Sequence, residues 1–209
     1  MSTFLLIRHA ENDYVKQGRL PGHLPGIHLN QIGYSQAQTL SNWLAQKLTD
    51  TPVKAVYSSP LERAMETAGP IAKAFELEVI PRPGLIETDC GDWTGKTTKS
   101  LRRLKLWQVV QQTPSQFQFP GGETILASPR RIVADLENLR TQHDPRDILV
   151  CVSHADPIKL AIIHYLGMPL DNLQRLSISP ASVTVLHTGE HGARLLNLNF
   201  DPAFLLPKT

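Results

Sequence analysis

The sequence predicts an α/β fold, a three-layer α/β/α sandwich around a mostly parallel sheet that has antiparallel strands towards the C-terminus. Short apolar runs alternate with segments of helical periodicity along the 209 residues, which is typical of strands that pair through crossover helices. The run 148–153 is unbroken and apolar, as in strands that are buried on both faces. Three short strand patterns joined by turns then close the chain, and tight turns connect antiparallel strands.

Length and composition favour one folded domain over residues 1–209. The hydrophobic fraction is 41% and the charged fraction is 19%, which allows a full core and argues against disorder. The formal net charge of +2 is too small to indicate nucleic acid or an anionic membrane as a partner. No apolar run approaches membrane-spanning length. A homodimer is compatible with the sequence, which shows no stripe of exposed hydrophobic residues.

The two cysteines, Cys90 and Cys151, show no metal-ligand spacing, and Cys151 lies in an apolar run that predicts a core position. The N-terminus has no basic region followed by an apolar segment of the kind that directs secretion. A reducing, cytoplasmic location is therefore expected.

The first half of the chain predicts three strands and two helices. In order, we expect a strand over 4–7, a long loop over 10–30, a helix from Gln31 to about Leu48, a strand over 53–57, a helix from Pro60 to about Phe75 and a strand over 78–80. Asn30 and Ser59 are the predicted N-caps of the two helices, and Tyr34 is predicted to face the core.

The second half predicts a structured loop, three helices and four strands. In order, we expect a loop over 85–95, a helix over 97–112, a Pro-Gly-Gly turn at 120–122, a helix from Glu123 to about Gln142, a strand over 148–153, a helix that stops at Gly167, and strands over 176–179, 182–187 and 194–198. The stretch 97–122 reads as an insertion that covers a pocket as a lid.

Chemically active side chains follow two of the predicted buried strands. Arg8 and His9 follow the first strand, and His154 follows the strand over 148–153. Ligands of open α/β sheets bind beyond the carboxyl ends of the strands, so two imidazoles are expected side by side. An imidazole beside a guanidinium suits a nucleophile that acts on an anion, for which phosphate is the obvious candidate.

Arg63 falls in the first turn of the helix that follows the strand over 53–57. A cation at this position opposes the helix dipole, so it favours a bound anion, as do the free N–H groups of that turn. An ion pair with Glu66 or another neighbouring acid is the structural alternative. The functional interpretation is favoured because this turn again follows the end of a strand.

Three carboxylates, at positions 87, 89 and 92, crowd the loop over 85–95. One of them, held against an apolar wall, would have its protonated form favoured and would suit a general acid. Arg19 and His23 in the loop over 10–30 are candidates to reach back to the site. Glu123 either faces the substrate, where it would repel a second carboxylate or phosphate, or is a plain helix cap.

Taken together, these motifs resemble the histidine phosphatase superfamily in its phosphoglycerate-mutase-like branch, from Leu6 to about Leu198. The resemblance rests on residues 8–11, 59–68, 87 with 91–95, and 152–154, in this order along the chain. The stretches 106–110, 119–123, 174–175 and 180–183 resemble a subgroup described as phosphomutases of an actinobacterial type.

The resemblance implies a role for five residues. His9 would attack phosphorus through one ring nitrogen while a backbone carbonyl holds the other. Arg8, Arg63 and His154 would surround the phosphoryl oxygens. Glu87 would protonate the leaving oxygen and then activate water. The resemblance implies neither a metal nor a cofactor.

The sequence departs from the family pattern at two positions beside the nucleophile. Ala10 stands where glycine is usual, and Asn12 stands where threonine or serine is usual. Both side chains are short, so we expect the end of the strand to keep its shape.

The resemblance leaves three functions to distinguish. The first is a metal-independent phosphatase that hydrolyses a small phosphomonoester, and the second is a phosphomutase that uses the same residues. The third is a non-catalytic anion-binding module, which is disfavoured because both histidines are present. The wall beyond the phosphate is expected to come from the loop over 10–30 with Arg19 and His23, from 97–122 and from Glu123.

Overall fold

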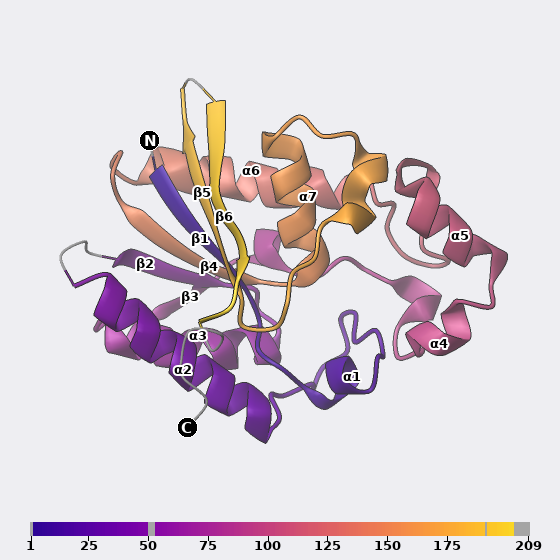
Figure 1. Ribbon diagram of the computed structural model, residues 1–209, viewed down its shortest axis with the longest axis horizontal. Helices are drawn as coiled ribbons and strands as arrows, with labels where there is room; N and C mark the ends of the chain where they lie inside the picture. Colours follow the sequence, from indigo (N-terminus) through magenta and orange to yellow (C-terminus); the bar gives the residue numbers. More distant parts are fainter. Residues whose placement is uncertain (1, 50–52, 191, 203–209) are drawn as a thin grey trace.

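The computed structural model describes residues 2–49, 53–190 and 192–202, and it has one six-stranded sheet with helices on both faces (Figure 1). The strands are β1 (Ser2–Arg8), β2 (Val53–Ser58), β3 (Val79–Pro81), β4 (Ile148–Ser153), β5 (Val183–Gly189) and β6 (Gly192–Phe200). The α-helices are α1 (Asp13–Lys16), α2 (Gln31–Lys47), α3 (Glu62–Ala74), α4 (Thr98–Leu101), α5 (Lys105–Gln112), α6 (Ala127–Gln142) and α7 (Ala155–Tyr165). Short 3₁₀ turns cover Pro83–Leu85, Gly91–Trp93, Pro114–Gln116 and Leu170–Arg175.

The strand order is β3-β2-β4-β1-β5-β6, so the sheet is parallel from β3 to β1 and antiparallel from β1 to β6. This confirms the predicted α/β fold with antiparallel strands towards the C-terminus. β1 and β4 are direct neighbours in parallel register, with Arg8 opposite Ser153. The residues that follow these two strands therefore emerge side by side at one edge of the sheet.

Alternate residues of the strands pack into two hydrophobic cores, one on each face of the sheet. Leu5 and Ile7 of β1 pack with buried residues of α2 and α3 on one face. Phe4 and Leu6 of β1 pack with buried residues of α6 and α7 on the other face. This period of two is what a strand buried on both faces requires, and it explains why β1 and β4 are continuous apolar runs. The three-layer prediction is confirmed.

A third cluster of buried residues joins the segment 90–125 to α7. It contains Trp93, Phe117 and Phe119, which pack against Leu160 and Ile163 of α7. Gly122 lies close under the loop before Trp93, since a Cβ on Gly122 would come within 2.5 Å of the Asp89 carbonyl oxygen. Segment 97–122, predicted as a lid, is thus packed onto the body of the protein through its aromatic side chains.

Several element boundaries differ from the predicted ones. The helix predicted from Pro60 begins at Glu62, and its N-cap Leu61 has no side-chain cap bond, so Ser59 is not the cap. The helix predicted over 97–112 is divided into α4 and α5. The helix predicted from Glu123 begins at Ala127, because residues 118 and 124 pair in an isolated β-bridge first.

Two further predictions are wrong. Residues 176–179 form no strand: the Ile178 carbonyl accepts from Arg8, and the Ser179 amide donates to the Asn199 side chain at 2.5 Å. Tyr34, predicted in the core, is 50% exposed, whereas its neighbour Gly33 and then Ala37 are buried residues of α2. Asn30 does cap α2, because its side chain accepts from the Gly33 amide.

Within the described ranges, no helix is long and apolar enough to cross a bilayer. Cys90 and Cys151 are both buried free thiols, and Cys151 is a core residue as predicted.

Candidate active site

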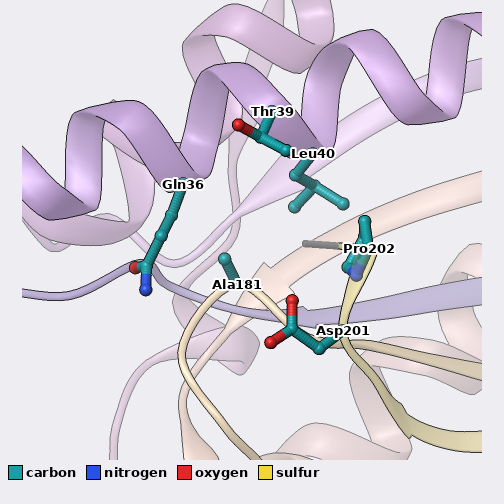
Figure 2. Close-up of a pocket in the computed structure, with 6 residues that line it drawn as sticks. All are labelled: Gln36, Thr39, Leu40, Ala181, Asp201 and Pro202. Atoms are coloured by element: carbon teal, nitrogen blue, oxygen red, sulfur yellow. The ribbon is translucent and has the colours of Figure 1, made fainter. Parts of the chain in front are cut away.

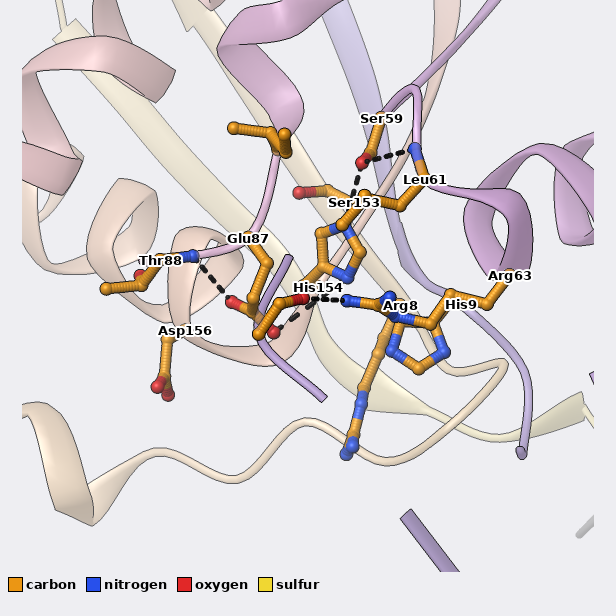
Figure 3. A network of polar contacts seen from close by, with 12 residues as sticks. Arg8, His9, Ser59, Leu61, Arg63, Glu87, Thr88, Ser153, His154 and Asp156 are labelled. Carbon is orange, nitrogen blue, oxygen red and sulfur yellow. Dashed lines mark hydrogen bonds and ion pairs between the residues drawn. The ribbon is translucent and has the colours of Figure 1, made fainter. Parts of the chain in front are cut away.

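The ends of β1 and β4 bring two histidines together. The ring centroids of His9 and His154 are 5.1 Å apart, with the rings at 61° to one another. His9 is 1% exposed and His154 is fully buried. Figure 3 shows the pair among Arg8, Ser59, Arg63 and Glu87. The predicted meeting of two imidazoles at one edge of the sheet is confirmed.

The hydrogen bond of His9 to the backbone fixes its tautomer. Nδ1 lies 2.7 Å from the carbonyl oxygen of Ala10, and a carbonyl only accepts, so Nδ1 carries the proton. The lone pair of the neutral ring is therefore on Nε2. The Ala10 amide in turn donates to the Thr67 hydroxyl of α3 at 2.9 Å, which holds the carbonyl in place. Ala10 is not among the non-glycine residues with positive φ, so its methyl group causes no strain there.

His154 is oriented by Ser59, which follows β2 on the other side of β4. The Ser59 hydroxyl lies 2.8 Å from His154 Nε2 and accepts a longer bond, 3.4 Å, from the Leu61 amide. Because the Ser59 oxygen accepts from the Leu61 amide, its own O–H group can donate to Nε2 of His154. The proton of the neutral His154 ring is then on Nδ1, which is buried without a hydrogen-bond partner. Nδ1 can therefore donate to a ligand.

Replacing Ser59 with alanine is expected to lower kcat about fivefold, since His154 loses the contact that fixes its tautomer and net hydrogen bonds of this kind contribute about 1 kcal/mol. Ser59→Thr, which keeps the hydroxyl, is the matched control and should recover most of the rate. Steady-state kinetics on both variants would measure this. Equal loss in the two variants would mean that Ser59 acts only through packing.

Two arginines supply positive charge beside the histidines. Arg63 is fully buried, and one guanidinium nitrogen donates to the Gly22 carbonyl at 2.8 Å. Its other two nitrogens, Nε and Nη1, have no partner. Arg8 donates to the Ile178 carbonyl at 2.6 Å, and its Nε is likewise buried without a partner. Glu66, the alternative partner of Arg63, instead bonds His28 and the Leu29 amide.

Unpartnered buried N–H groups on cations are costly unless an anion satisfies them. The unpartnered nitrogens of Arg8, Arg63 and His154 all belong to this one cluster. The arrangement is therefore suited to bind a tetrahedral oxyanion such as a phosphoryl group.

Phosphate or vanadate should accordingly raise the Tm of the protein. A ligand at about a hundred times its Kd adds about 2.7 kcal/mol to the free energy of unfolding. In Arg63→Gln the Tm shift should largely disappear. In the control Arg140→Gln, which removes only a partly exposed ion pair with Glu137, the shift should persist. A Tm that phosphate does not change in the unmodified protein would contradict an anion site here.

Burial and nearby cations keep both histidines neutral. Desolvation, and then the charges of Arg8 and Arg63, lower the pKa of His9 well below its ordinary value. Desolvation and Arg63 lower the pKa of His154 in the same way. His9 thus keeps a free lone pair down to acidic pH, as a nucleophile requires.

Glu87 is the carboxyl group that faces the histidines. Its side chain is 14% exposed, and Oε2 lies 3.8 Å from Nδ1 of His154. Desolvation, and then the charge of Asp156, raise the pKa of Glu87 to about 7, although Arg63 and the Thr88 amide act against this shift. A carboxyl group that is half protonated near neutral pH suits a general acid that later becomes a base.

Of the three other predicted site residues, His23 contacts this cluster, whereas the contacts of Arg19 and Glu123 lie outside it. His23 contacts it, since its Nε2 donates to the Glu87 carbonyl at 2.6 Å. Arg19 is exposed and donates to the Gly95 carbonyl, so its contacts lie away from the histidines. Glu123 accepts from the Asp89 amide at 2.7 Å and pairs with Arg131 at 2.9 Å. Substrate binding by these three residues stays a prediction.

Four features of the site were not identified from the sequence. Ser59 was assigned to a helix cap, Thr67 supports the Ala10 amide, and the Gly22 carbonyl holds Arg63. Asp156, in the first turn of α7, is the charge that raises the pKa of Glu87 after desolvation. The position of Asp156 two residues after His154 was the one available signal.

A small hollow elsewhere is not a rival substrate site. It lies between α2 and the segment after β6, and Gln36, Leu40, Ala181 and Asp201 are among its lining residues (Figure 2). Its volume of about 10 Å³ is room for a single water molecule. In the part of the chain that the structure describes, no group of three or more His, Cys, Asp and Glu side chains is arranged to hold a metal ion.

Sequence comparison assigns this arrangement to a known family. The model of the histidine phosphatase superfamily (branch 1) matches residues 4–201, which include all the residues of the cluster. The chain belongs to the histidine phosphatase superfamily. This confirms the resemblance on which the expected roles of His9, Arg8, Arg63, His154 and Glu87 rest.

Relatives within the superfamily include both phosphatases and a mutase. Phosphoserine phosphatase 1 of Hydrogenobacter thermophilus is 32% identical over 204 residues, which cover 95% of this chain and 92% of that protein. A 2,3-bisphosphoglycerate-dependent phosphoglycerate mutase of Thermoplasma acidophilum is 29% identical over 187 residues, covering 89% and 87%. A bifunctional protein of Mycobacterium tuberculosis is 33% identical, and this chain spans 54% of its length.

The fold of this chain is shared with a solved structure. A mutant phosphoserine phosphatase from Entamoeba histolytica, solved in complex with phosphoserine, is 26% identical with a TM-score of 0.83. The match covers 99% of this chain and all of that one, 100%.

Proposed function

We propose that this protein is a phosphatase that hydrolyses a small phosphomonoester through a phosphohistidine at His9. The observation that carries the proposal is the geometry of His9. Its Nδ1 bonds the Ala10 carbonyl, so Nε2 bears the lone pair in a cluster where Arg8, Arg63 and His154 have unpartnered N–H groups. Related phosphoserine phosphatases support the reaction class.

In the first step the Nε2 lone pair of His9 attacks phosphorus and the ester P–O bond breaks. The transition state is loose and spreads charge over the phosphoryl oxygens, which Arg8, Arg63 and Nδ1 of His154 stabilise. Glu87 gives its proton to the departing alkoxide, and the alcohol leaves. In the second step a water molecule gives a proton to Glu87 and attacks phosphorus, so that the N–P bond breaks and His9 is restored.

The guanidinium groups provide the charge that a metal ion provides in many phosphatases. Activity is therefore expected to resist EDTA, whereas loss of activity on chelation would reopen a metal-dependent mechanism. We further propose that segment 97–122 covers the bound ester as a lid, and that the protein acts in the cytoplasm. The two buried free thiols fit a reducing compartment.

A phosphomutase is the alternative, since one relative is a phosphoglycerate mutase. The same residues would serve, but the phosphohistidine would have to outlive the approach of water and phosphorylate a second hydroxyl group.

Incubation with 2,3-bisphosphoglycerate and 3-phosphoglycerate distinguishes the two functions. We expect release of inorganic phosphate from phosphomonoesters and no isomerisation of 3-phosphoglycerate. Isomerisation without net phosphate release would contradict the phosphatase proposal. Nuclear magnetic resonance of phosphorus follows both reactions in one sample.

A further inference from the structure

A cavity whose wall includes Cys90 and Asp156 is lined by aromatic side chains from the segment 90–125. Trp93, Trp107 and Phe119 form its apolar wall, and Gln111, Asp156 and Gln174 are its polar groups. We call it the aromatic cavity. The rings of Trp93 and Trp107 are stacked with centroids 6.1 Å apart, and Phe119 meets Trp93 edge-on at 5.6 Å. We propose that this cavity binds the leaving group of the substrate, and that this group is an uncharged ring.

The aromatic cavity lies where the leaving group must go. Glu87 is the acid that protonates the leaving oxygen under the proposed function, on which this inference rests. Asp156, whose charge raises the pKa of Glu87, is part of the cavity wall, as is Cys90, three residues after Glu87. In Figure 3, Glu87 lies between Asp156 and the two histidines. An ester seated on His9 with its oxygen towards Glu87 therefore directs its alcohol towards this cavity.

The charge of the wall disfavours an anionic leaving group. Among the described lining residues there is no lysine or arginine, and the single ionisable carboxyl group is that of Asp156. Asp156 already pairs with Lys159 at 3.2 Å. A carboxylate placed in the aromatic cavity would lose its hydration and find no unpaired cation among the lining residues, which is costly. Esters of hydroxy acids are therefore poor candidates for it.

The size of the cavity matches a single ring. Its volume is about 140 Å³, close to that of an engineered apolar cavity of roughly 150 Å³ that binds benzene. Contacts between aromatic rings stabilise a bound ring by more than the burial of its apolar area alone. The amides of Gln111 and Gln174 can orient a substituent on such a ring. A benzyl-type or cycloalkyl alcohol fits this chemistry.

Benzyl phosphate and ethyl phosphate test the inference, because both release a simple primary alcohol and differ in the ring. We expect kcat/KM of the full chain to be about tenfold or more higher for benzyl phosphate. In Trp107→Ala the ratio of the two values should fall to about threefold or less. Trp43→Ala is the matched control: Trp43 is also half-buried, but it packs on Phe200 away from the cavity, so its ratio should not change.

A second variant keeps the test independent of the folding of Trp107→Ala. Gln111→Arg places a cation in the wall, and we expect it to lower kcat/KM for benzyl phosphate and to raise it for 2-phosphoglycolate, which carries a carboxylate. Equal kcat/KM for the benzyl and ethyl esters in the unmodified protein would overturn the inference. So would faster hydrolysis of phosphoserine than of benzyl phosphate, which would place the leaving group in the adjoining hollow that is lined by Arg8 and Lys159 and shares Gln174 with the aromatic cavity.

If the proposed phosphatase function is wrong, the result differs from the results that overturn this inference. In that case none of the esters would be hydrolysed, yet the cavity would still be tested by binding. Benzylphosphonate, which is not hydrolysed, should raise the Tm more than ethylphosphonate, and equal shifts would overturn the inference.

Discussion

Replacing His9 with alanine is expected to abolish turnover of p-nitrophenyl phosphate, with kcat lowered by at least about a thousandfold. The neutral imidazole is the group whose lone pair attacks phosphorus, and the pKa of His9 is lowered by desolvation and by two arginines, so the free lone pair is present throughout the neutral range. The Ala10 carbonyl holds Nδ1 of His9, which leaves the lone pair on Nε2, and the His9 ring lies against that of His154. Initial rates at saturating substrate measure the effect.

His164→Ala is the matched control for a lost imidazole. His164 is exposed on α7, where its ring contacts Tyr165, and its removal should leave the rate within about twofold. Circular dichroism and Tm establish that both variants are folded. A His9→Ala protein with unchanged activity would refute the assignment of the nucleophile.

Replacing Glu87 with glutamine is expected to lower kcat for an alkyl ester such as ethyl phosphate by about a hundredfold or more, because the alkoxide then leaves without a proton. p-Nitrophenolate is a good leaving group and needs no proton. With p-nitrophenyl phosphate the variant should therefore release about one equivalent of p-nitrophenolate in a burst and then turn over slowly, since no base activates water in the second step.

The pH dependence of kcat/KM also tests the role of Glu87 as the general acid. The pKa of Glu87 is raised to about 7, so the acid is present below that pH and is lost as the pH rises through it. For ethyl phosphate kcat/KM should fall above about pH 7, and Glu87→Gln should lack this decline. Asp92→Asn, an exposed carboxyl in the same segment, should keep the parent profile. A decline that persists in Glu87→Gln would assign it to another group.

The local parts of the site were predictable from the sequence because they depend on short segments. An apolar run followed by Arg8 and His9, and another followed by His154, placed these side chains at the ends of strands, where the structure has them. Arg63 was predicted in the first turn of a helix, and it is the second residue of α3. In each case strand or helix patterning alone decides the position.

The remaining features depend on the order of the strands, which the sequence does not encode locally. β2 lies beside β4, so Ser59 reaches His154 instead of capping α3. Residues 176–179 have strand-like patterning, but the carbonyl of Ile178 is taken by Arg8 rather than by a neighbouring strand. Glu123 was placed at a helix start because it follows a Pro-Gly-Gly turn, whereas its carboxylate bonds the distant Asp89 amide. Tertiary contacts override the local signal at all three positions.

Trapping of the covalent intermediate tests the central claim most directly. The full chain is mixed with p-nitrophenyl phosphate, quenched with alkali, in which phosphohistidine survives, and digested for mass spectrometry. We predict one phosphoryl group on His9 in the unmodified protein, a larger phosphorylated fraction in Glu87→Gln and none in His9→Ala. Turnover with no phosphorylation of His9 in Glu87→Gln, or a phosphoryl group on another residue, would contradict the account.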